Sequence, residues 1–172
     1  MTEGDLLKVI NKLNDIVFNI EKVLAIILAL GLLISLAGGV LFRYVLKSPL
    51  FWSDELAIFC LIWITFIGGS MSLKENASPS ITLLTDLMPK KFEKYIKVLS
   101  NIILLAFVAY ILYLAIEWIS MPNILVQTST AMNMPKIYFY LSIPISFVFS
   151  VIHVLVNILL IFTNSEKEGS LQ

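Results

Sequence analysis

Long uncharged runs of apolar residues divide this chain into segments. Each run reaches the ~18 residues that a helix needs to cross about 30 Å of hydrocarbon. The pattern therefore predicts an all-α integral membrane protein with four transmembrane helices. The runs cover residues 23–42, 56–73, 98–116 and 137–165. The expected helix bounds are about 23–45, 54–73, 95–117 and 136–163.

A fifth uncharged run, residues 118–135, differs in composition. It contains two prolines, two asparagines, a glutamine and several hydroxyl side chains. A backbone broken by such residues would lack hydrogen-bond partners in lipid. We predict an outer loop here.

Two shorter stretches place apolar and polar residues at helical spacing. Residues 1–22 predict an amphipathic helix that lies on the inner leaflet or against a partner. Residues 78–94 predict a second amphipathic helix on the cytoplasmic side, because Ser78 followed by Pro79 is typical of a helix start. Lysines in and just after this second stretch are expected to anchor the chain to lipid head groups. They are Lys90, Lys91, Lys94 and Lys97.

Composition supports a membrane location. The chain is 59% hydrophobic and 14% charged, against about 45–50% and about 25% in soluble domains. Nine basic residues lie in the N-terminal segment, the middle loop and the tail, and three lie on the opposite side. The positive-inside rule therefore predicts that both termini are cytoplasmic. The formal net charge of zero gives no reason to expect nucleic acid as a partner.

Small residues recur along the first two predicted spans at a spacing that favours close helix contact. We predict that these faces pack helices against each other. They are formed by Gly31, Ser35 and Gly39 in the first span and by Thr65, Gly68 and Ser72 in the second.

The fourth predicted span has a polar stripe at steps of three or four residues. A stripe facing lipid would leave hydrogen-bond donors unpaired, so it should face protein. His153 is expected to be neutral, with Asn157 one turn away as a candidate partner. The stripe consists of Ser142, Ser146, Ser150, His153 and Asn157.

Apart from this stripe, ionisable side chains are almost absent from the predicted spans. Membrane enzymes and ion pathways usually need such groups within the bilayer. Because the chain has one histidine, a bis-histidine haem or a histidine-based metal site is not expected. The sequence predicts no catalytic residue, no metal site and no cofactor.

Charge is concentrated between the first two spans. Arg43 ends the first span, and Asp54 and Glu55 begin the second. Ser53 is suited to cap the second helix, and Trp52 is suited to the interfacial aromatic belt. One interpretation is a capped hairpin whose charges reach water. The alternative is that Arg43 pairs with Glu55 or Asp54 and fixes a shape that a partner recognises.

The order of residues in this region resembles one protein family. R-Y-V is followed by a short proline-containing loop, then by F-W-S-D-E-L-A and W-I-T-F-I-G-G-S. This order is similar to the small membrane subunit of tripartite ATP-independent periplasmic (TRAP) transporters, the DctQ-like family. The matching residues are Arg43, Trp52, Glu55, Trp63 and Gly68. Such subunits often have a histidine after the second span, whereas residues 77–81 of this chain read A-S-P-S-I.

The resemblance implies a non-catalytic scaffold subunit, multi-pass in the bacterial inner membrane. A large multi-spanning subunit would hold the substrate and sodium sites, and a soluble periplasmic binding protein would deliver an organic acid such as a dicarboxylate or a sialic acid. Membrane lipids are further expected partners, and structural phospholipid is compatible with this picture. The interface candidates are Arg43, Trp52, Asp54, Glu55, Trp63, Gly68, Ser146, Ser150, His153 and Asn157.

Two other classes stay open from the residues alone. A self-assembling four-helix channel or small exporter predicts that the chain alone forms a transporting oligomer, and the scarcity of intramembrane charge argues against a charged substrate. A membrane enzyme acting on lipid or quinone predicts turnover by the isolated chain. The missing catalytic set argues against it.

Overall fold

The protein is built from long α-helices and short connections. The structure, a computed structural model, describes residues 3–75 and 90–169. These residues contain an isolated β-bridge between Thr128 and Pro135 but no β-strand. The helices are α1 (Glu3–Tyr44), α2 (Phe51–Lys74), α4 (Lys90–Ile119), α5 (Pro122–Leu125), α6 (Ile137–Tyr140) and α7 (Ser142–Gly169).

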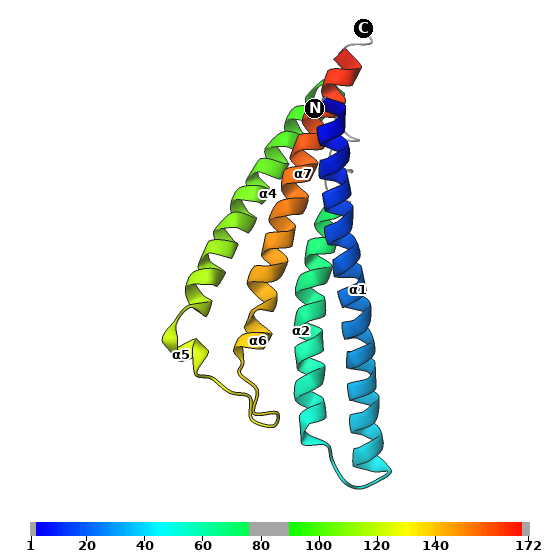
Figure 1. Cartoon of the computed structure of the whole chain (residues 1–172), viewed down its shortest axis with the longest axis vertical. Helices are drawn as coiled ribbons and strands as arrows, with labels where there is room; N and C mark the ends of the chain where they lie inside the picture. Colours follow the sequence, from blue (N-terminus) through cyan, green and yellow to red (C-terminus); the bar gives the residue numbers. More distant parts are fainter. Residues whose placement is uncertain (1–2, 76–89, 170–172) are drawn as a thin grey trace.

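The four long helices form a fan (Figure 1). Helix α1 packs on α2, α2 packs on α7, and α7 packs on α4, with a smaller contact between α1 and α7. The helices converge where both termini lie, which we call the terminal end, and they spread apart toward the opposite, loop end. The turn between α1 and α2 and the short helix α5 lie at the loop end.

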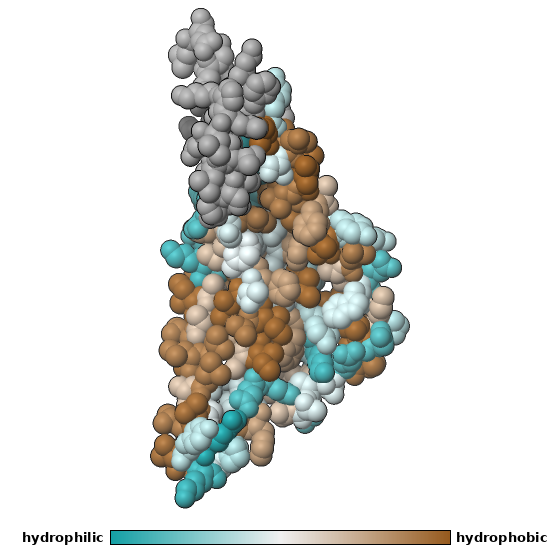
Figure 2. All heavy atoms as spheres, turned by 180° about the vertical axis from the view of Figure 1, so that it is seen from behind, coloured by the Kyte–Doolittle hydropathy of each residue, from teal (hydrophilic) through white to brown (hydrophobic). Residues whose placement is uncertain are grey.

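All four long helices are long and apolar enough to cross a membrane. The qualifying segments are Val9–Tyr44, Phe51–Lys74, Tyr95–Ile119 and Ile137–Ile161. Figure 2 shows apolar residues over much of one face, with hydrophilic residues gathered around the loop end. Such a surface suits hydrocarbon and not water. The predicted all-α, four-span membrane architecture is confirmed.

Helix α1 is continuous from Glu3 to Tyr44, so no break separates its N-terminal part from the first span. Its side toward the bundle alternates steps of four and three residues, which is the spacing of helices packed at a shallow angle. The residues on this side are buried or half-buried, whereas Val9, Leu13 and Ile20 are about half exposed. The side consists of Ile10, Asn14, Val17, Glu21, Leu24, Leu28, Gly31 and Ser35. Of the polar residues in this part of α1, Asn14 and Glu21 are buried against the bundle, whereas Lys12, Asp15 and Lys22 are exposed. The placement of this segment on the inner leaflet stays a prediction.

The start of α2 also differs from expectation. The helix begins at Phe51 after Leu50, which makes no side-chain capping bond. Ser53 lies inside the first turn, buried, and its Oγ donates to the carbonyl oxygen of Leu50 at 2.8 Å. The predicted capping role of Ser53 is wrong, because the helix starts two residues earlier.

The two predicted segments outside the spans are described to different extents. Residues 118–135, predicted as a loop, include the end of α4, the short helix α5 and the isolated bridge. Much of the predicted amphipathic segment 78–94 lies outside the described residues. The lipid-anchoring role of Lys90, Lys91, Lys94 and Lys97 stays a prediction.

The glycines of α1 and α2 have different surroundings. A Cβ at Gly39 would lie 2.7 Å from Ser53 Oγ, and one at Gly31 would lie 3.2 Å from Cys60 Sγ. A Cβ at Gly68 would meet nothing within 4 Å in the described part of the chain. Thr65 and Ser72 are exposed as well. The predicted small residues of α1 therefore pack against α2, whereas the three predicted on α2 face out of the bundle.

Replacing Gly39 with alanine should lower stability by about 1–2 kcal/mol, because the new methyl group must displace a buried and hydrogen-bonded hydroxyl. Gly68→Ala is the matched control on α2, and it should be neutral or slightly stabilising, because alanine favours the helix. Thermal unfolding of the purified chain in lipid nanodiscs compares the two. Equal destabilisation by both variants would contradict these packing assignments.

Candidate functional site

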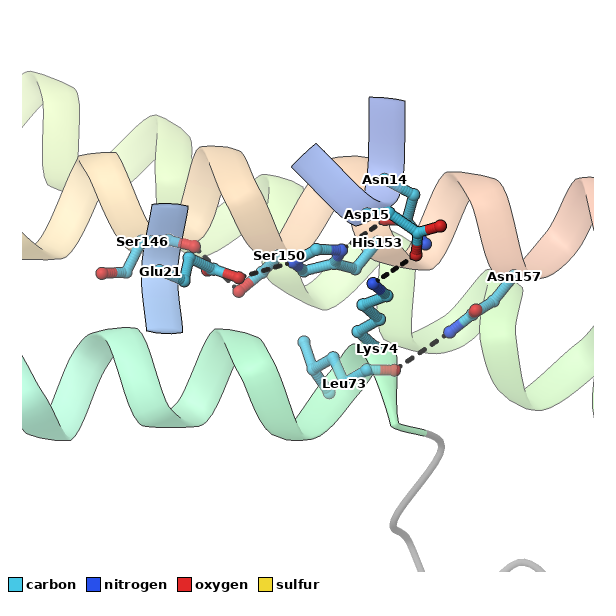
Figure 3. A network of polar contacts seen from close by, with 9 residues as sticks. All are labelled: Asn14, Asp15, Glu21, Leu73, Lys74, Ser146, Ser150, His153 and Asn157. Atoms are coloured by element: carbon cyan, nitrogen blue, oxygen red, sulfur yellow. Dashed lines mark hydrogen bonds and ion pairs between the residues drawn. The ribbon is translucent and has the colours of Figure 1, made fainter. Parts of the chain in front are cut away.

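The first candidate site is a buried polar cluster around His153, which lies between α1 and α7 (Figure 3). The ring atom Nδ1 lies 2.5 Å from Asn14 Oδ1, and Nε2 lies 2.8 Å from Glu21 Oε2. His153 and Glu21 have no exposed surface, and Asn14 is 5% exposed. Both ring nitrogens are therefore held by the first helix.

The helix geometry explains why these three side chains meet. Asn14 and Glu21 lie seven residues apart on α1, about 10.5 Å along the helix axis. An imidazole has its two nitrogens on opposite sides of the ring. His153 points from α7 into the space between the two α1 side chains, so each nitrogen reaches one of them.

The rest of the α7 stripe also faces the bundle. Asn157 Nδ2 donates to the carbonyl oxygen of Leu73 on α2 at 3.0 Å. Ser150 Oγ donates to the carbonyl oxygen of Ser146 one turn earlier at 2.9 Å. Both serines are buried. The proposed pairing of His153 with Asn157 is wrong, because Asn14 and Glu21 occupy the ring.

An ion pair lies beside the cluster, toward the terminal end. Lys74 Nζ donates to Asp15 Oδ1 at 2.8 Å and lies 4.1 Å from the ring centre of Phe18. The Asp15 side chain is 66% exposed and that of Lys74 is 18% exposed. This pair links α1 to the end of α2 where solvent can reach it, so it adds little to stability.

Sequence reasoning missed Asn14 and Glu21. Glu21 precedes the first uncharged run by two residues and so falls outside the predicted span, yet it belongs to a helix qualified to cross a membrane. The expectation that ionisable side chains are almost absent from the spans therefore fails for the first helix, which contains Glu21. Counting back from Ser35 and Gly31 by alternate steps of three and four reaches Glu21 and Asn14, so the sequence does contain a signal for them.

The second candidate site is at the loop end, where Glu55 holds the loop before α6. Its carboxylate accepts hydrogen bonds from Thr130 N, Thr130 Oγ1 and Ala131 N at 2.9 Å each and from Met132 N at 2.8 Å. Asn133, next along the chain, has a φ of 51° and turns the loop back toward Pro135. Successive backbone N–H groups around an anion form a nest. Glu55 is therefore the anchor of this loop.

Arg43 pairs with the neighbour of Glu55. Its Nη2 donates to Asp54 Oδ2 at 2.9 Å, with side chains 50% and 63% exposed. The sequence left Asp54 and Glu55 open as partners of Arg43, and in the structure the partner is Asp54. Glu55 instead accepts hydrogen bonds from the loop before α6.

The Arg43–Asp54 pair should be weak. Because both side chains are half exposed, we expect Arg43→Gln or Asp54→Asn to change stability by less than about 1 kcal/mol. Thermal unfolding at low and at high salt measures this. A loss of several kcal/mol that persists at high salt would show that the pair is a structural lock after all.

The remaining predicted residues contribute to packing. Trp63 Nε1 donates to the carbonyl oxygen of Tyr138 at 3.0 Å and so joins α2 to α6. Ser35 Oγ donates to the carbonyl oxygen of Ser53 at 2.6 Å and joins α1 to α2. Trp52 is 45% exposed at the loop end. Within the described residues, no three His, Cys, Asp or Glu side chains come together that could hold a metal ion.

Comparison with known proteins gives a family. The family model described as "Tripartite ATP-independent periplasmic transporters, DctQ component" matches residues 23–164. The isethionate TRAP transporter permease protein DctMQ of Oleidesulfovibrio alaskensis is 25% identical over 135 residues, which is 75% of this chain and 21% of that protein. The sialic acid TRAP transporter small permease protein SiaQ of Vibrio cholerae is 30% identical over 79 residues, 46% of each chain.

The sialic acid TRAP transporter permease protein SiaT of Haemophilus influenzae is 34% identical over 79 residues, which is 46% of this chain and 12% of that protein. The matched region thus spans less than half the length of each of these three relatives. In two of them it is a small part of a much longer permease chain.

Proposed function

The chain belongs to the DctQ component family of tripartite ATP-independent periplasmic (TRAP) transporters, and from this premise we propose that it is a non-catalytic accessory subunit supporting sodium-coupled uptake of an organic acid. The observation that carries the proposal is the family match across residues 23–164. Two relatives are named for isethionate and sialic acid, both organic acids, which supports this substrate class.

The polar contacts within the bundle support a scaffold. His153, Asn157 and Ser35 all form hydrogen bonds to a neighbouring helix of the same chain. Polar side chains used in this way hold a bundle together and leave few groups to bind a moving solute. Substrate and sodium would then bind to a large multi-spanning partner subunit in the bacterial inner membrane.

A large partner is supported by the relatives, because the matched region is only 21% of the DctMQ permease and 12% of SiaT. The remaining length of those chains is permease outside the matched part. A periplasmic substrate-binding protein would approach the loop end. Trp52 and the loop held by Glu55 lie there and are the candidate contacts.

The test is co-purification. A tag on the C-terminal tail, extraction of native membranes in mild detergent and mass spectrometry identify what is recovered at constant ratio. We expect a larger polytopic membrane protein. Untagged cells serve as the control for non-specific recovery. A homogeneous oligomer of this chain alone would contradict the proposal and would favour the self-assembling channel.

A further inference from the structure

The contact between Glu21 and His153 contains a hydrogen atom whose position sets the charge inside the bundle. In the amide orientation that the structure has, Asn14 Oδ1 can only accept, so Nδ1 of His153 is the donor at 2.5 Å. The other ring nitrogen, Nε2, lies 2.8 Å from Glu21 Oε2. A bare nitrogen lone pair and a bare carboxylate oxygen repel each other, so one further hydrogen lies between these two atoms.

This hydrogen can belong to either residue. On the ring, it makes an imidazolium beside a carboxylate. On Glu21, it makes a neutral carboxylic acid that donates to a neutral imidazole. Both arrangements have no net charge, but they differ in the cost of burial, because separated charges lose far more on leaving water than neutral groups do.

The second oxygen of Glu21 distinguishes the two arrangements. Glu21 Oε1 is buried and has no hydrogen-bond partner in the described part of the chain. An ionised carboxylate shares its charge over both oxygens and needs donors on both. In a neutral acid, Oε1 is a carbonyl oxygen, which costs less to leave unpaired. The unpaired oxygen therefore favours the neutral acid.

The surrounding charges do not favour an anion at Glu21. On α2 the nearest cation is Lys74, which pairs with Asp15 of α1. The next residue of α1, Lys22, is exposed. Apart from His153, helix α7 contributes no Asp, Glu, Lys or Arg among its described side chains, and α4 contributes Lys97 close to the terminal end. Within the described residues, His153 is the only ion-pair partner of Glu21.

We propose that Glu21 is a proton-binding site in the membrane, with a proton on Oε2 that is donated to Nε2 of a neutral His153. Carboxyl groups in water are ionised well above pH ~4.3. When α1 docks on α7, Glu21 must therefore take up one proton, and it releases that proton when the helices separate. Docking of α1 is thus coupled to proton binding, and it weakens as the pH rises.

The first experiment uses the full chain, labelled with ¹⁵N-histidine, in lipid nanodiscs between pH 6 and pH 8. His153 is the only histidine, so its two nitrogens give the only ring signals. We expect Nδ1 to carry a hydrogen and Nε2 to carry none. The infrared C=O band of a protonated carboxylic acid should be present and should disappear in Glu21→Gln.

Protonation of Nε2 would overturn the proposal. If Nδ1 also carries a hydrogen, the ring is an imidazolium beside a carboxylate. If Nδ1 carries none, the amide of Asn14 is reversed and Glu21 is an uncompensated anion. A ring that titrates between pH 6 and 8, as an exposed histidine does, would also overturn it.

A second measurement compares unfolding of the wild-type chain, Glu21→Gln and Asp15→Asn at pH 6 and pH 9. Between pH 6 and pH 9 the wild-type and Asp15→Asn unfolding equilibria should shift toward the unfolded state at least about tenfold more than that of Glu21→Gln, because only the former two can release a proton from Glu21 on unfolding. Glutamine keeps the shape and can donate to Nε2. An equal pH dependence in all three proteins would contradict proton uptake at Glu21.

Discussion

Replacing Glu21 with alanine should lower the free energy of unfolding by about 2–4 kcal/mol, which is among the largest effects expected for a single residue here. The change leaves Nε2 of His153 buried without a partner and opens a cavity beside it. His153→Ala should cost about 3–5 kcal/mol, because it leaves Asn14 Oδ1 and Glu21 Oε2 unpaired and removes a larger side chain. Thermal unfolding in nanodiscs ranks the variants. The readout is the loss of the monodisperse chromatographic peak as the temperature rises.

The double variant identifies the cause. If the two residues act through their shared hydrogen bond, the loss in the double variant should fall short of the sum by about 1 kcal/mol or more. Asp15→Ala is the matched control, since it removes an exposed carboxylate from the same helix and should cost less than about 1 kcal/mol. Additive losses would show that the side chains matter only for filling space.

Glu55→Ala should release the loop at residues 130–132 from α2. Four hydrogen bonds end on this one carboxylate, three of them from backbone N–H groups. We expect amide hydrogen exchange at Thr130, Ala131 and Met132 to become faster by about tenfold or more. Glu55→Gln should have an intermediate effect, because its amide nitrogen cannot accept a hydrogen bond.

Asp54 gives the control for this prediction. It is the neighbouring carboxylate on α2, and its partner is Arg43 and not the loop. Asp54→Ala should leave exchange at residues 130–132 unchanged. Exchange that is equally slow in Glu55→Ala and in the wild-type protein would mean that the bridge between Thr128 and Pro135 holds the loop without Glu55.

The four spans could be predicted because uncharged runs of sufficient length have few alternatives to crossing a membrane. The amphipathic pattern at the start of the chain is also visible, but it does not separate the buried polar residues from the exposed ones. Asn14 and Glu21 turn toward His153, whereas Lys12 and Lys22 of the same helix are exposed. A polar residue at steps of three and four along the helix side that faces the bundle is the pattern that identifies such positions.

The partners at the loop end could not be predicted in the same way. Asp54 and Glu55 are neighbours on a helix and point about 100° apart, so each faces a different part of the structure. Spacing alone could not show which of them faces Arg43. The loop that binds Glu55 lies 75 to 77 residues further along the chain, where no local pattern connects the two.

The long-range contact between α1 and α7 also constrains how the protein is made. Glu21 and His153 are separated by 132 residues. At about 5–20 residues per second of synthesis, roughly 7–26 s pass between the synthesis of Glu21 and the synthesis of His153. During that interval Glu21 must stay near water or accept a proton, because a lone carboxylate is costly in hydrocarbon. The nascent chain therefore completes its core only after its last span is inserted. Truncated chains that end before His153 leave Glu21 unpaired, and membrane quality control can recognise such an acid.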